Sequence, residues 1–237
     1  MATENLLYRR DYPITDSIQV VIPTVGQILE NEDLYNEIVS VFTAVPIDFM
    51  VQLDDAGIDF TTISEFDLFV MLFEELKNID TSLVLGDLDL NGFELCVNNQ
   101  TKKLVFYNQE LGIEIGRREQ SLIASVLRRI NHFEKNRKKP ANEDAKKYMI
   151  ERMRAKMKRR SRTEASRLEQ LIIAMVNTEQ FKYDFEAVRS LTIYQFHESV
   201  RQIINKINYD NRMFGVYSGT VNIKELSQDE LDWISHK

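Results

Sequence analysis

The sequence predicts a predominantly helical α+β protein, with a small antiparallel sheet in its N-terminal part and long helices in its C-terminal part. Turn-forming residues support this division, because six of the eight glycines and three of the four prolines precede residue 117. Neither type occurs between Pro140 and Gly215, which favours uninterrupted helices there. Between residues 81 and 115 the apolar period is two, whereas most other segments show helical spacing. The length of 237 residues fits one or two domains.

The first predicted elements are a strand and a long helix. Residues 17–22 alternate as a strand does and are followed by Pro23. Thr24 is a suitable N-cap, so a helix is expected to begin there and continue to about Ala44.

Two further helices are predicted before the sheet. Pro46 fits the first turn of a short helix that reaches Asp55 and ends at Gly57. Ser64 can cap a strongly apolar helix over residues 65–78, which we expect at the centre of the N-terminal core.

A β-hairpin is predicted over residues 93–107, and residues 111–115 can add a third strand. Residues 82–85 are also β-like. A helix follows over residues 120–135, with one apolar face made of Leu122, Val126, Ile130 and Phe133.

The C-terminal part is predicted to be helical. Residues 136–142 are polar and contain Pro140, so they are the best candidate for a linker. From residue 142 the chain is expected to be helical to about 178, with a basic first half. Thr192 can cap a last long helix whose inward residues are Phe196, Val200, Ile203, Ile204 and Ile207. Gly215 and Gly219 are expected to end that helix, and Ser227 to cap a final turn.

These elements predict two parts, an acidic α+β part over residues 1–135 and a helical part over residues 142–237. The two parts can pack as one body. The charge distribution supports the division, because the net charge of −7 hides opposite local charges. Residues 1–116 carry a net −16, whereas residues 117–167 carry a net +12. Such sorting of charge along a chain indicates either a partner or an internal contact.

Several function classes are excluded at this point. Cys96 is the only cysteine, so no intrachain disulfide can form and a reducing compartment is expected. Cys96 is predicted to be a small buried residue of its strand. No secretory signal is expected at the N-terminus, and no apolar segment is long enough to cross a bilayer. These features predict a location in the cytoplasm without membrane contact.

Metal and catalytic sites are also not expected. Residues 87–92 match the start of an EF-hand calcium loop, but Asn98 replaces the required glutamate and the flanking helices are missing. The segment is therefore interpreted as an acidic turn. His132, His197 and His236 are too far apart in sequence to indicate a metal site, and the first two are expected at helix surfaces. Because no nucleophile–base pair, phosphate-binding loop or metal motif is present, the sequence predicts a non-enzymatic protein without a cofactor.

One basic segment stands out as a candidate binding site. Lys146 to Arg162 contains nine lysines and arginines but a single acid, Glu151. Three methionines recur there every four residues and form a narrow apolar stripe on a cationic helix expected over residues 142–162. The candidate contact residues are Lys146, Lys147, Met149, Arg152, Met153, Arg154, Met157 and Arg160.

Three interpretations of the basic helix remain open. It can bind nucleic acid through its cations, although no cluster suited to base contacts is present. It can dock on a helical protein partner, because methionine adapts to imperfectly matched grooves. It can also pack on the chain's own acidic N-terminal part.

The sequence resembles tail morphogenesis proteins from tailed phages and prophages of Gram-positive bacteria, among which it is similar to tail assembly chaperones. The resemblance extends from about Ile14 to Trp233 and rests on core and turn patterns. The segments that carry it are residues 14–18, 23–28, 51–59, 64–69, 173–177, 181–183, 196–200 and 215–219.

The resemblance implies a non-enzymatic assembly factor that binds a phage structural protein, either the tape measure protein or the tail tube protein. The basic helix would then lie along a helical partner. Two alternatives stay open: a phage nucleic-acid-binding protein that uses the same helix, and a permanent structural component of the tail or connector. A homo-oligomer is compatible with each of them.

Overall fold

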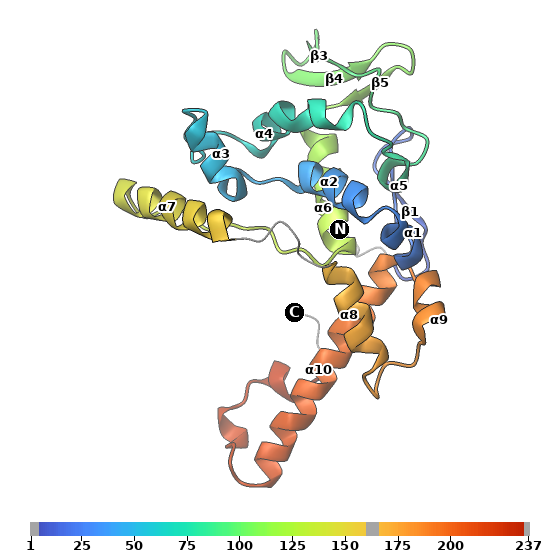
Figure 1. Ribbon diagram of the computed structural model, residues 1–237, viewed down its shortest axis with the longest axis vertical. Helices are drawn as coiled ribbons and strands as arrows, with labels where there is room; N and C mark the ends of the chain where they lie inside the picture. Colours follow the sequence, from blue (N-terminus) through green and yellow to red (C-terminus); the bar gives the residue numbers. More distant parts are fainter. Residues whose placement is uncertain (1–4, 160–165, 235–237) are drawn as a thin grey trace.

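The computed structural model describes residues 5–159 and 166–234. It confirms a predominantly helical α+β fold with small antiparallel sheets in the N-terminal part and long helices in the C-terminal part (Figure 1). Strand β1 (Asp11–Pro13), which the sequence pattern did not reveal, pairs with the expected strand β2 (Gln19–Val21) in an antiparallel ribbon. Ile18, Val20 and Ile22 are buried around it.

The helix expected from Thr24 to Ala44 is two helices. α1 (Val25–Glu30) begins with a capping box in which Thr24 and Gln27 exchange hydrogen bonds, and α2 (Glu32–Thr43) follows. Asn31 interrupts the helical path because its backbone has φ −142°. Asparagine is weak within helices, so the prediction of one continuous helix was wrong at this residue.

The apolar helix after Ser64 lies at the centre of the core, as predicted. It consists of α4 (Glu65–Leu72) and the 3₁₀ turn η2 (Phe73–Leu76). The Phe69 ring centroid lies 5.2 Å from that of Phe42 and 5.8 Å from that of Phe106. These residues belong to the large hydrophobic core, hereafter the main cluster. Upstream, the predicted short helix is the 3₁₀ turn η1 (Pro46–Phe49) followed by α3 (Met50–Asp55).

The second sheet contains β3 (Glu94–Val97), β4 (Leu104–Asn108) and β5 (Ile113–Ile115), paired in this order. This confirms the hairpin and its third strand. Two predictions here were wrong. Residues 82–85 form the short helix α5 (Ser82–Leu85), which buries Val84 and Leu85. Cys96 is exposed, because all four residues of β3 lie at the outer edge of the sheet.

Helix α6 (Arg117–Ile130) ends earlier than the predicted residue 135. Asn131 follows it, and His132 takes a left-handed backbone conformation with φ 53°, which terminates the helix. Phe133 therefore lies outside the helix and is half exposed rather than facing the core. Residues 133–142, which include the segment 136–142 predicted as a linker, contain no helix or strand.

The C-terminal half contains α7 (Glu143–Arg159), α8 (Arg167–Val176), α9 (Phe185–Ser190) and α10 (Ile193–Tyr217). Thr192 caps α10 as predicted, and Ser227 caps the turn η4 (Gln228–Leu231), which follows η3 (Ile223–Glu225). Gly215 does not end α10 but lies buried within it, and Gly219 follows with φ 78°.

Backbone hydrogen bonds join the start of α10 to the start of α1. The Val25 amide donates to Leu191 O and the Ile193 amide donates to Pro23 O, both at 2.9 Å. Ile193, Phe196 and Val200 of α10 are buried in the main cluster together with the N-terminal elements. The two ends of the chain therefore complete one core.

Candidate functional site

The basic helix α7 lies against α3, at the side of the molecule (Figure 1). Its contact is with a second, smaller hydrophobic core, hereafter the second cluster. Ile150 of α7 is buried in this cluster, and Met149 and Met153 pack against it while remaining partly exposed. Its other buried members are Ala44, Val45, Ile47, Met50, Val51, Leu53, Phe60 and Leu68.

Two ion pairs flank this apolar contact. Lys146 Nζ lies 2.9 Å from Asp59 Oδ2, and Arg154 lies 3.1 Å from Asp54 Oδ2 and also contacts Asp55. The Thr61 amide and the Lys146 ammonium lower the pKa of Asp59 to about 2. The carboxylates also raise the pKa of Arg154. The buried residues of the second cluster other than Ile150, together with Asp54, Asp55 and Asp59, are called the α7-binding surface below.

The structure divides the eight predicted contact residues into two groups. Lys146, Met149, Met153 and Arg154, together with Ile150, face the α7-binding surface and form the inner face of α7. Three of the other predicted residues, Lys147, Arg152 and Met157, are exposed. The last one, Arg160, lies outside the described residues.

The methionine stripe therefore does not act as one unit. A residue turns by about 100° about a helix axis, so each step of four residues overshoots a full turn by about 40°. Met157 is consequently rotated away from Met149, and 45% of its surface is exposed. The sequence left open whether this helix packs on the acidic N-terminal part, and the structure shows that it does so by one face only.

The exposed side of α7 is strongly cationic. Lys147, Arg152, Lys156, Lys158 and Arg159 are exposed and make no ion pair with the described residues. We call these five residues the outer cationic face. A surface of this kind attracts anionic partners over distances set by the ionic strength.

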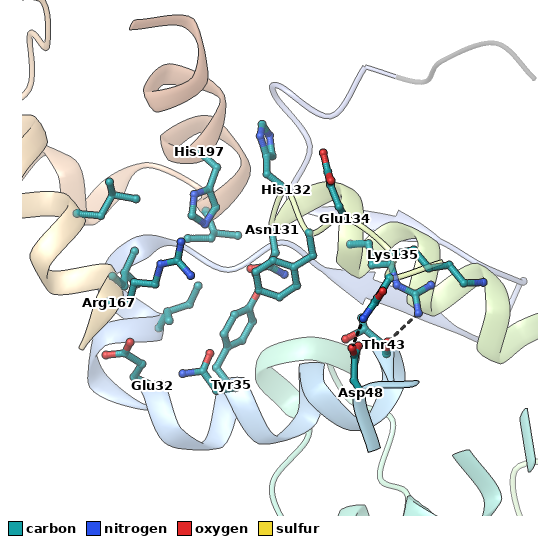
Figure 2. A pocket seen from close by; sticks show the side chains of 18 of the residues that line it. Glu32, Tyr35, Thr43, Asp48, Asn131, His132, Glu134, Lys135, Arg167 and His197 are labelled. Carbon is teal, nitrogen blue, oxygen red and sulfur yellow. Dashed lines mark hydrogen bonds between the residues drawn. The ribbon is translucent and has the colours of Figure 1, made fainter. Parts of the chain in front are cut away.

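A cleft of about 690 Å³ lies where α2 and the end of α6 face α8 and α10. Figure 2 shows Arg167 and His197 on one side of it, and Asp48 and Lys135 on the other. Between them, Tyr35 OH donates to Asn131 Oδ1 at 2.9 Å, and Asn131 Nδ2 donates to Leu127 O at the same distance. Because these buried polar groups already have partners, they join α2 to the end of α6 on the N-terminal side of the cleft.

Two histidines meet at this cleft although they are far apart in sequence. The ring centroids of His132 and His197 are 5.8 Å apart, and His132 Nε2 lies 3.5 Å from Glu198 Oε2. Burial, with the nearby His132 and Arg167, lowers the pKa of His197 to about 4. Burial also lowers the pKa of His132. The prediction that both histidines lie at a helix surface was therefore wrong, since His132 follows α6 and His197 is partly buried against it.

No metal site is found in the described part of the chain. No group of three or more histidine, cysteine, aspartate or glutamate side chains there could hold a metal ion. No single described helix is long and apolar enough to cross a membrane. One bent pair, α2 with η1–α3, meets this test by length and composition, but its two halves are inclined at 116°.

The far end of α10 and the segment after it form an exposed apolar surface. α10 extends away from the rest of the molecule toward this end (Figure 1). Ile204 was predicted to face inward but is exposed, because α10 extends beyond the core after Val200. Phe214 and Tyr217 are 75% and 83% exposed. These two residues are three positions apart on the helix and so share a face, and large exposed apolar patches are typical of protein contact surfaces.

The comparison with protein families concerns this C-terminal region. Residues 158–237 match the family model of the YomV second domain. This domain is of phage type, YomV-like, as in a Bacillus prophage. The match covers 80 of the 237 residues. Neither the search of curated proteins nor the search of solved structures found a match.

The segment that matches the YomV second domain starts at the end of α7 and contains α8, α9 and α10. It supplies Arg167 and His197 to the cleft and the whole exposed end of α10. The inner face of α7 precedes it. The sequence indicated the basic helix directly, whereas the cleft and the histidine pair depend on contacts between distant segments and left no local pattern.

Proposed function

We propose that this protein is a non-enzymatic, chaperone-like assembly factor of a phage tail. It acts in the host cell cytoplasm without a cofactor and binds a helical phage structural protein, such as the tape measure or tail tube protein. The match of residues 158–237 to a phage-type domain supports the phage assignment. The tail role rests on the resemblance to tail assembly chaperones.

The outer cationic face is the observation that carries the proposed binding. Five cations on one helix remain without a counter-charge among the described residues, although carboxylates are abundant elsewhere in the chain. A partner helix with acidic side chains would supply these counter-charges and so orient itself along α7. The exposed end of α10 offers a second, apolar contact for the same partner.

The test is co-purification with the tape measure protein from the same phage, after co-expression. Arg152→Glu with Lys156→Glu reverses two exposed charges of the outer cationic face, and retention should fall by about tenfold. Lys102→Glu with Lys103→Glu is the matched control, because it reverses two exposed lysines between β3 and β4, away from α7 and from the end of α10. Equal retention by both double variants, or none by the unchanged protein, would refute the proposal.

Nucleic acid is the second candidate partner, favoured by the same five residues of the outer cationic face. Binding to phosphates releases counterions, so affinity would fall by several orders of magnitude between about 50 and 200 mM salt. Retention on DNA that depends steeply on salt and is lost in the Arg152/Lys156 variant would favour this candidate. A protein partner predicts little retention on DNA at physiological salt.

A further inference from the structure

The α7-binding surface does not need α7 for its own core. Ile150 is the only fully buried residue of the second cluster that α7 provides, and all the others lie between Ala44 and Leu68. That segment runs into α4, where Leu68 belongs to the second cluster and the next residue, Phe69, belongs to the main cluster. The segment is therefore attached to the main cluster independently of α7. Removal of α7 would therefore expose the surface without dismantling the fold around it.

The attachment of α7 is also small. Of the 17 residues of this helix, only Ile150 is buried. The flanking ion pairs are partly open to solvent, with 45% of the Asp54 side chain and 63% of that of Asp55 exposed. Ion pairs with this exposure contribute little to stability. Residues 137–139, just before the helix, are exposed and have no regular structure, so they can accommodate a displacement.

The inner face of α7 is nevertheless suited to a specific surface. Its apolar centre consists of Met149, Ile150 and Met153, and a cation stands on either side. Lys146 and Arg154 are eight residues apart, which is about 12 Å along a helix. The matching surface must therefore offer an apolar strip with carboxylates near both of its ends. The α7-binding surface has this arrangement, with Asp59 at one end and Asp54 and Asp55 at the other.

We propose that α7 is a detachable binding helix, and that the α7-binding surface covers its inner face until a partner competes for it. The partner presents the chemistry of the surface it replaces, namely an apolar helical stripe flanked by carboxylates. This inference rests on the proposed function only in taking that partner to be a helical protein. In the free protein, the α7-binding surface keeps Met149 and Met153 from non-specific contacts. Because α7 must detach before it binds, the apparent affinity of the protein for its partner is lower than that of a free α7.

A designed helical peptide tests this proposal without any phage component. The probe carries leucines along one face and glutamates on both sides of them, and its binding is measured by fluorescence anisotropy. Asp54→Asn, Asp55→Asn and Asp59→Asn together remove the charges that hold α7 but leave α7 unchanged. The amide oxygen introduced at position 59 can still accept the hydrogen bond that Asp59 accepts from the Thr61 amide. The apparent affinity for the probe should rise by about tenfold.

Asp80→Asn is the matched control, since Asp80 accepts a comparable hydrogen bond from the Ser82 amide and is not paired with α7. Its affinity should equal that of the unchanged protein. Met149→Ser with Met153→Ser, added to the triple variant, should abolish the gain. An unchanged or lower affinity in the folded triple variant would overturn the proposal, as would a gain that survives the methionine changes.

This result is separable from that of the proposed function. If the triple variant binds the probe more tightly than the unchanged protein and the methionine changes abolish this gain, α7 is a detachable helix. If the tape measure protein is not retained by the same protein, the tail role is refuted separately. If instead the tape measure protein is retained and the triple variant binds the probe no better than the unchanged protein, the proposed function stands and the detachable helix is refuted.

Discussion

Helices α7 and α10 are the two longest of the described chain, and they contact the rest of the molecule in opposite ways. α10 starts inside the main cluster, is joined to α1 by backbone hydrogen bonds, and becomes exposed only after Val200. α7 touches the second cluster through one buried residue and is exposed on its other sides. Length alone thus says little about how firmly a helix is held.

The difference follows from the distribution of apolar and charged side chains. α10 has apolar residues along its whole length but buries the large ones only within its first eight residues, at Ile193, Phe196 and Val200, and so acts as an anchored arm with an exposed end. α7 spreads three methionines among many cations, and its contact therefore combines a narrow apolar strip with ion pairs. We expect changes in α10 to affect the stability of the whole protein, whereas changes in α7 affect mainly its own attachment.

The largest expected effect is at the anchored end of α10. Phe196 is fully buried and makes an edge-to-face contact with Phe181. Phe196→Ala should lower the free energy of unfolding by about 3–5 kcal/mol, measured by chemical denaturation. Phe214→Ala, at the exposed end of the same helix, should change it by no more than about 0.5 kcal/mol. A large effect at Phe214 would mean that the arm is buried in an oligomer.

The second effect concerns pH and the histidine pair. Because the pKa of His197 is about 4 in the folded protein, the unfolded chain, with the ordinary value of 6.5, binds more protons between these values. Stability should therefore be fully present above pH 6.5 and decrease as the pH falls toward 4, by roughly 3 kcal/mol in total. His197→Gln should remove most of this decrease in denaturation curves measured at pH 7 and pH 4.5. An unaltered pH dependence in that variant would assign the effect to other groups.

The third effect is local to α7. Ile150→Asp places a carboxylate in the second cluster, and the helix can avoid this cost by detaching. The global free energy of unfolding should therefore change by less than about 2 kcal/mol, well below the usual cost of a buried charge. Trypsin cleavage after Arg152 or Arg154 should become much faster in native conditions. Rapid global unfolding of this variant would show that α7 is as essential to the core as α10.

The smallest effect is expected on the outer cationic face. Arg152→Ala and Lys156→Ala each remove an exposed side chain without an ion pair to the described residues. Each should change the free energy of unfolding, measured by thermal denaturation, by no more than about 0.5 kcal/mol. A clear rise in stability would indicate that repulsion among these cations opposes the folded state.

Much of the fold was predictable where the deciding interactions are local. The capping residues Thr24, Ser64 and Thr192 each bond to a residue three positions ahead, so the sequence marks these helix starts directly. The early end of α6 and the exposure of Cys96 were not predictable in this way. They depend on the left-handed turn at His132 and on the position of β3 at a sheet edge, respectively.

The candidate site was predictable only in part, for the same reason. Charge and methionine spacing identified α7, but they could not tell which face it buries. That choice depends on Asp54, Asp55 and Asp59, about 90 to 100 residues earlier, and on the apolar residues around them. The meeting of His132 with His197 likewise needs the three-dimensional arrangement of α6 and α10.

The hydrogen bonds between residues 23–25 and 191–193 also affect how the protein is made. Ribosomes release the N-terminal segment first, so Ile18, Val20, Ile22 and Val25 emerge long before Ile193 and Phe196, with which they share a core. During that interval their side chains lack a large part of their final surroundings. A chain that stopped before α10 would keep this surface open, and we expect such a product to aggregate or to be degraded.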